Sequence, residues 1–202
     1  MVKKLSTIIL LLFFVDFANS QENTTIPNAD PFCSDTGILF NNTTGNITAE
    51  EGPNYGCLLG TRPRPSWFYI RIDQPGDLSL QIEQNTQDDF TGTGIDVDFI
   101  AWGPFRETTL EDIQNGNYDL LSTQNQVDCS WSSAAIETLN IEDAETGSYY
   151  LILITNFGGN AGFIRMYENF PGQAGTGTTD CSIVAGALED QDVCLGEEVR
   201  LD

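Results

Sequence analysis

Four aspartates are the first residues whose type and spacing suggest chemistry. Asp88 and Asp89 are adjacent, whereas Asp96 and Asp98 are two residues apart and therefore share one face of an extended strand. Carboxylate oxygens are the hard ligands that Ca²⁺ prefers, and extracellular modules bind it with modest affinity. We hypothesise a calcium site at these four residues. The alternative is that they lie on the solvated face of a half-buried strand, which needs no metal.

Large aromatic side chains suggest a second kind of site. Trp67, Tyr69, Trp102 and Trp131 are candidates for a platform on which sugar rings stack, as in carbohydrate-binding modules. The alternative is that these rings pack in the core of the fold, where aromatic side chains contribute large buried areas. An exposed aromatic strip is the feature that separates the two interpretations.

The composition argues against catalysis and against nucleic-acid binding. The chain has no histidine, and its lysines are confined to Lys3 and Lys4, so the commonest general base is missing. Glycosidases use two carboxylates that flank the scissile bond. Because the chain has 30 acidic residues, some such pair is expected by chance, and its presence is no evidence for a glycosidase. A formal net charge of -22 repels nucleic acid. We therefore expect no enzyme and no nucleic-acid partner.

Residues 1–20 have the pattern of a secretory signal peptide. Lys3 and Lys4 precede an apolar run over residues 5–15, and Ala18-Asn19-Ser20 provides small residues for cleavage. Removal of this segment leaves 6 basic and 29 acidic residues, a net charge of -23. The apolar run is too short to span a membrane, and no later stretch is long enough. The sequence thus predicts a secreted or cell-surface protein without a membrane span.

Five cysteines fit this oxidising location. Cys33, Cys57, Cys129 and Cys181 are expected to form two disulfides, for which three pairings exist. We favour Cys33 with Cys57 and Cys129 with Cys181. Cys194 follows a glycine-rich stretch and is left without a partner.

Alternating apolar and polar residues predict antiparallel strands. The pattern occurs over residues 68–72, 78–82, 95–99 and 163–167, and residues 149–154 are apolar on both faces, as in a central strand. Thr108 and Glu111 resemble a capping box that begins one short connecting helix ending near Gly116. The predicted fold is an all-β, antiparallel two-sheet β-sandwich of jelly-roll type over residues 21–183. Residues 171–179 are expected to form a linker or loose loop.

Short motifs spread over residues 31–183 resemble a known kind of module. They are Pro31-Phe32-Cys33, Tyr55-Gly56-Cys57, Pro65-Ser66-Trp67, Asp98-Phe99-Ile100-Ala101-Trp102-Gly103-Pro104-Phe105, Asp128-Cys129-Ser130, Tyr149-Tyr150, Ile154-Thr155-Asn156-Phe157 and Thr179-Asp180-Cys181-Ser182. The order of elements resembles the bacterial pre-peptidase C-terminal domain. More narrowly, the motifs look like an N-terminal module of Bacteroidota surface proteins associated with gliding motility. The resemblance implies type IX secretion through a C-terminal domain downstream of this sequence.

Residues 184–202 look like the start of a truncated immunoglobulin-like or PKD-like repeat, so further domains are expected to follow. Export and the lack of histidine lead us to expect a non-catalytic, extracellular binding and structural module with a glycan or a protein as its partner. The resemblance implies that this module belongs to an adhesin-like protein. A second hypothesis is a carbohydrate-binding accessory domain of a secreted hydrolase, and calcium is the one cofactor that the sequence suggests.

Overall fold

The protein is a two-sheet β-sandwich, as the alternating pattern predicts. The computed structural model describes residues 22–34 and 38–184. The predicted signal peptide, Cys194 and nearly all of the predicted repeat at 184–202 lie outside these residues. Within the described residues, no helix has the length and apolar character needed to cross a membrane.

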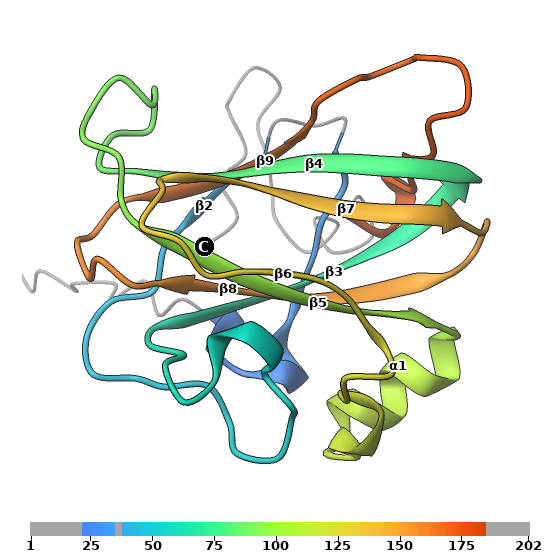
Figure 1. The fold of residues 1–202 in the computed structure, drawn as a ribbon, viewed down its shortest axis with the longest axis horizontal. Coiled ribbons are helices and arrows are strands. Elements are labelled where there is room, and N and C mark those ends of the chain that lie inside the picture. The colour runs from blue at the N-terminus through green and yellow to red at the C-terminus, as the bar shows by residue number, and fades with distance from the viewer. Residues whose placement is uncertain (1–21, 35–37, 185–202) are drawn as a thin grey trace, which may run out of the picture.

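The larger sheet has six strands and the smaller sheet has four (Figure 1). The larger sheet runs in the order β1 (Asp30–Pro31), β3 (Pro65–Gln74), β8 (Tyr149–Asn156), β5 (Val97–Phe105) and β6 (Gln126–Ser130), and β10 (Thr178–Thr179) also pairs with β3. The smaller sheet runs in the order β2 (Leu39–Asn41), β9 (Phe163–Glu168), β4 (Gly76–Asn85) and β7 (Ile136–Ala144). All pairs are antiparallel except β1 with β3.

The main core lies between the two sheets. Along each strand every second side chain enters this core, so Leu78, Leu80 and Ile82 of β4 meet Val97 and Phe99 of β5. Strand β8 is buried along its whole length, which confirms the prediction of a central strand. Its other face is covered by a second apolar cluster. Burial of both faces explains why its sequence does not alternate.

Helical segments and loops cover the outer face of the larger sheet. They include α1 (Glu107–Gln114) and the 3-10 helices η1 (Glu22–Thr24), η2 (Ile26–Asn28), η3 (Gly56–Leu58) and η4 (Tyr118–Leu120) (Figure 1). The short helix was predicted in the correct place, but its capping box was wrong. Arg106 is the N-cap residue and makes no side-chain cap, because the helix already begins at Glu107 and includes Thr108.

Two disulfides are present, but their pairing differs from the one favoured above. Cys33 bonds Cys181, and Cys57 bonds Cys129. Strand β8 occupies one edge of β3, so β1 and β10 both pair along the other edge. This common edge brings the chain segments of Cys33 and Cys181 together across a sequence separation of 148 residues.

Candidate functional site

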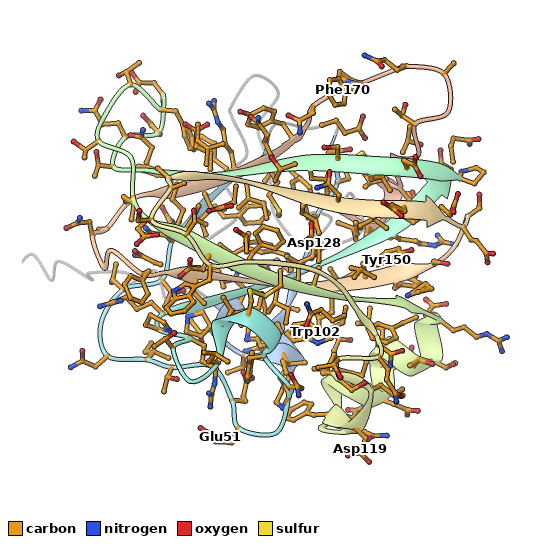
Figure 2. The ribbon with its side chains drawn as sticks, viewed as in Figure 1. Glu51, Trp102, Asp119, Asp128, Tyr150 and Phe170 are labelled. Atoms are coloured by element: carbon orange, nitrogen blue, oxygen red, sulfur yellow. A yellow bond between two sulfur atoms is a disulfide. The ribbon has the colours of Figure 1, made fainter. Side chains whose placement is uncertain are left out.

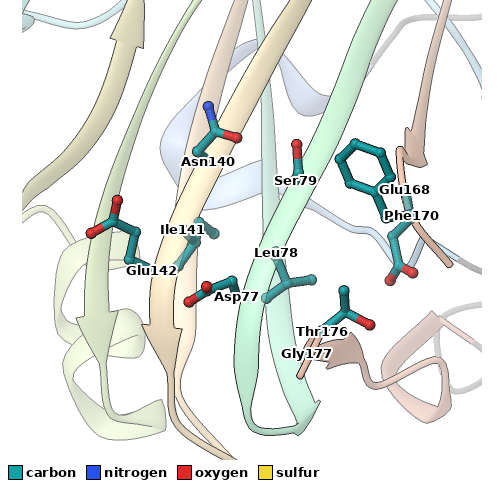
Figure 3. A pocket seen from close by; sticks show the side chains of 10 residues that line it. All are labelled: Asp77, Leu78, Ser79, Asn140, Ile141, Glu142, Glu168, Phe170, Thr176 and Gly177. Carbon is teal, nitrogen blue, oxygen red and sulfur yellow. The ribbon is translucent and has the colours of Figure 1, made fainter. Parts of the chain in front are cut away.

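A pocket of about 310 Å³ lies on the outer face of the smaller sheet (Figure 3). Its floor is formed by neighbouring parts of β4 and β7, and its wall by the end of β9 and the chain that follows it. The residues that line it are Asp77, Leu78, Ser79, Asn140, Ile141, Glu142, Glu168, Phe170, Thr176 and Gly177. Leu139 and Ile141 of β7 are buried in the core, so Asn140 between them faces outward to the pocket.

Backbone hydrogen bonds hold the pocket wall against strand β4. The amide of Asn169 donates to the carbonyl of Ser79 at 2.9 Å, and the amide of Gly177 donates to the carbonyl of Asp77 at 2.9 Å. Residues 170–176 therefore form an arch anchored at both ends. The predicted loose loop at 171–179 is in part a paired segment, since Thr178 and Thr179 form β10.

Gly76 allows the arch to approach the sheet this closely. Its φ is +141°, and a Cβ atom at this position would lie 2.4 Å from the carbonyl oxygen of Gly175. A side chain there would push the wall of the pocket away.

The polar side chains of the pocket are carboxylates, hydroxyls and one amide, and they surround a single aromatic ring. Phe170 is 53% exposed and lies with Glu168 on one side of the pocket, whereas Asn140 and Glu142 lie across it (Figure 3). No arginine is among the described residues that line the pocket. Such a site suits a ligand that offers hydroxyl or amino donors and an apolar face, and it disfavours anions.

Glu168 is positioned by residues next to a disulfide. Its Oε1 accepts a hydrogen bond of 2.5 Å from the hydroxyl of Ser34, and the Ser34 hydroxyl lies 2.9 Å from that of Thr179. The amide of Ser34 also donates to Oγ1 of Thr179 at 2.7 Å. Because Ser34 follows Cys33 in the chain, the bond between Cys33 and Cys181 holds this network together.

The predicted aromatic platform is wrong for two of its four members. Trp67 and Trp102 are fully buried under the helical segments and loops that cover the larger sheet, with ring centroids 5.9 Å apart in a stacked arrangement. Trp102 lies on the side of the larger sheet that these segments cover (Figure 2). Tyr69 is half-buried, and its ring packs 6.4 Å from that of Tyr149. Trp131 is 53% exposed, after β6, and is not part of the pocket. The four residues therefore form no common surface.

The four predicted calcium ligands fall into two different environments. Asp88 and Asp89 are exposed, and Oδ1 of Asp89 accepts hydrogen bonds from the amide and hydroxyl of Thr91. These hydrogen bonds hold the pKa of Asp89 below its usual value. Asp96 is half-buried and Asp98 is fully buried.

The pKa values of Asp96 and Asp98 are both raised above the usual value of an aspartate. Burial raises the pKa of Asp98 to about 7, with repulsion from Asp96 and Glu137 adding to the rise and a hydrogen bond from the amide of Ser132 opposing it. Burial, followed by repulsion from Glu137, raises the pKa of Asp96. Among residues 22–34 and 38–184, no three acidic or cysteine side chains gather closely enough to hold a metal ion.

Sequence reasoning missed the pocket residues. Phe170 stands in a polar, Pro- and Gly-rich stretch, and an isolated aromatic residue in such a stretch is the one signal that could have indicated an exposed ring. Asn140, Glu142 and Glu168 carry no comparable signal, because outward polar residues occur on every half-buried strand.

Comparisons with models of known protein families and with curated proteins find no match to this chain.

Proposed function

We propose that this chain is a non-catalytic extracellular binding module that holds a neutral or amine-bearing glycan in the pocket beside Phe170. The observation that carries the proposal is the exposed ring of Phe170 next to side chains that accept or donate hydrogen bonds. A sugar ring offers the matching surfaces, since its C–H face stacks on an aromatic ring and its hydroxyls bond carboxylates and amides.

The size and charge of the pocket narrow the class of glycan. A volume of about 310 Å³ is at the lower end of small-ligand pockets, which suits one or two sugar units of a longer chain. Asp77, Glu142 and Glu168 place negative charge around the ligand, so uronic acids and sulfated sugars are disfavoured.

Export and a surface location are the second part of the proposal. Two disulfides support an oxidising, extracellular environment, and the pattern of residues 1–20 supports secretion. The motif resemblance supports an adhesin-like protein that leaves the cell by type IX secretion. Lack of histidine supports a binding role over catalysis. An accessory domain of a secreted hydrolase would use the same pocket, and the identity of a downstream domain would distinguish the two.

A glycan array tests the binding proposal. Purified protein should bind neutral or amine-bearing glycans, and Phe170→Ala should weaken binding about fivefold, because one stacking contact contributes roughly 1 kcal/mol. Phe157→Ala is the matched control, since Phe157 is 42% exposed but does not line the pocket.

Four results would each overturn part of this proposal. Equal weakening by both variants, or binding restricted to acidic glycans, would exclude the pocket as the glycan site. Release of reducing ends from a bound glycan would contradict a non-catalytic role. Protease or biotin labelling of intact cells that finds the full-length protein only in the periplasm would contradict a surface location.

A further inference from the structure

The carboxylates of Asp96 and Asp98 lie together on the outer face of the larger sheet. Val97 and Phe99 enter the core between the sheets, so Asp98, like Ile100 two residues later, points to the opposite side. Asp96 immediately precedes β5, and its carbonyl accepts a hydrogen bond of 3.2 Å from the amide of Phe157. This bond continues the pairing of β5 with β8, which keeps Asp96 on the same face as Asp98.

Buried oxygens without a hydrogen-bond partner gather at this place. Asp98 is 1% exposed; its Oδ1 accepts a hydrogen bond from the amide of Ser132 at 3.1 Å, but its Oδ2 has no partner among the described residues. Oδ1 of Asp96 is also buried and lacks a partner there. An ionised carboxylate left in this state is costly, by several kcal/mol as a general rule.

Thr155 provides an independent observation of the same kind. It is fully buried, and its hydroxyl oxygen has no hydrogen-bond partner among the described residues. In the register of β5 and β8, Thr155 lies directly opposite Asp98, so the two side chains project from the same face of the sheet. A neutral hydroxyl therefore lies on the same face of the sheet as the two carboxylates.

The surrounding charge is negative. Glu137 accepts hydrogen bonds from the hydroxyls of Ser130 and Ser132. Its negative charge repels the carboxylates of Asp96 and Asp98. The three ion pairs within the described part of the chain join other residues, namely Arg62 with Glu51, Arg71 with Asp180 and Arg165 with Glu83. A bound cation would compensate the charge that no arginine compensates here.

We propose that Asp96, Asp98 and the hydroxyl of Thr155 bind one Ca²⁺ ion. The donors are all oxygen, which suits a hard cation and disfavours Zn²⁺. Calcium accepts irregular geometry and completes its shell with carbonyls and water, whereas Mg²⁺ requires a nearly ideal octahedron. Only two carboxylates bind directly, so the affinity should lie near the millimolar range of extracellular calcium modules.

Thermal unfolding of the purified full chain tests this site. In 10 mM CaCl₂ the unfolding midpoint should rise by roughly 3–6 °C over its value in EDTA, and MgCl₂ should produce a smaller rise. Asp98→Asn should fold in EDTA, because asparagine carries no charge to bury, and should lose the calcium-dependent rise. Asp96→Asn provides a second variant with the same expected loss.

The matched control is the double variant Asp88→Asn and Asp89→Asn. Both residues are exposed, so the calcium-dependent rise should remain. Loss of the rise in this control, or its persistence in both Asp98→Asn and Asp96→Asn, would overturn the assignment. Isothermal titration of the wild-type protein with CaCl₂ that yields no saturable heat, together with an unchanged midpoint, would exclude the site altogether. These readouts contain no glycan and are therefore independent of the proposed function.

Discussion

The hydroxyl of Ser34 donates a hydrogen bond of 2.5 Å to Glu168, although 134 residues separate the two in the sequence. This contact links the start of the sandwich to the wall of the pocket on the smaller sheet. It lies next to the disulfide of Cys33 and Cys181, so covalent and polar interactions reinforce each other at this corner of the fold.

Replacement of Ser34 by alanine tests this link. Ser34 is buried, and the change removes the hydroxyl that Glu168 and Thr179 share. We expect a loss of about 1–2 kcal/mol in the free energy of unfolding, measured with urea, and weaker glycan binding. Threonine at this position keeps the hydroxyl and should restore part of both. Unchanged binding by the alanine variant would show that the position of Glu168 does not matter to the ligand.

The two disulfides should differ in their effect on the pocket. Replacing Cys33 and Cys181 together by alanine should lower the free energy of unfolding by roughly 2–5 kcal/mol, because a closed loop of this length strongly restricts the unfolded chain. The same double change at Cys57 and Cys129 should destabilise comparably, since those residues are 72 apart. Only the first pair should impair binding in conditions where both variants remain folded, and equal impairment would contradict the arrangement described above.

Gly76→Ala should disrupt the arch over the pocket. A methyl group would collide with the carbonyl of Gly175, so we expect a cost on the order of 3 kcal/mol in urea unfolding and loss of glycan binding. Gly45→Ala is the control, because Gly45 also has a positive φ, +85°, but nothing lies within 4 Å of its Cβ position. That variant should cost about 1 kcal/mol and bind normally. Equal costs would show that the arch readily moves.

Two tryptophans should have opposite consequences when truncated. Trp67→Ala removes a fully buried ring that stacks on Trp102 and should destabilise the protein by about 3–5 kcal/mol. Trp131→Ala removes an exposed ring and should change the free energy of unfolding by only about 0.5 kcal/mol. Acrylamide quenching should likewise reach Trp131 alone in the folded wild type. Ready quenching of Trp67 and Trp102 would contradict their burial.

Stability should fall at alkaline pH because of Tyr55. Its ring is buried against Trp67 and Trp102, its hydroxyl donates to the carbonyl of Glu50 at 2.6 Å, and burial raises its pKa well above the usual value. The folded state therefore retains the proton that the unfolded state loses near pH 10, so this stabilisation is complete below pH 10 and declines above it. Between pH 9 and pH 11 the wild type should lose about 1.4 kcal/mol more than Tyr55→Phe. Identical pH profiles for the two proteins would contradict this assignment.

The strands of the sandwich follow from the sequence because their pattern is local. Phe68, Ile70 and Ile72 alternate with polar residues, and a period of two allows only one face to be buried, so the strand and its inner face are predictable without a partner. Export-type cysteine usage likewise indicated that two disulfides form.

Contacts between distant parts of the chain determine the disulfide pairing, the burial of two tryptophans and the pocket. Cys33 meets Cys181 because β1 and β10 share one edge of β3, and no local pattern encodes which edge a short strand will use. Trp67 and Trp102 point away from the main core, and they become inaccessible only when the helical segments and loops fold over the larger sheet. The pocket depends on contact between β4 and an arch about 90 residues later, so Glu168 and Phe170 acquire their place only when the chain is folded.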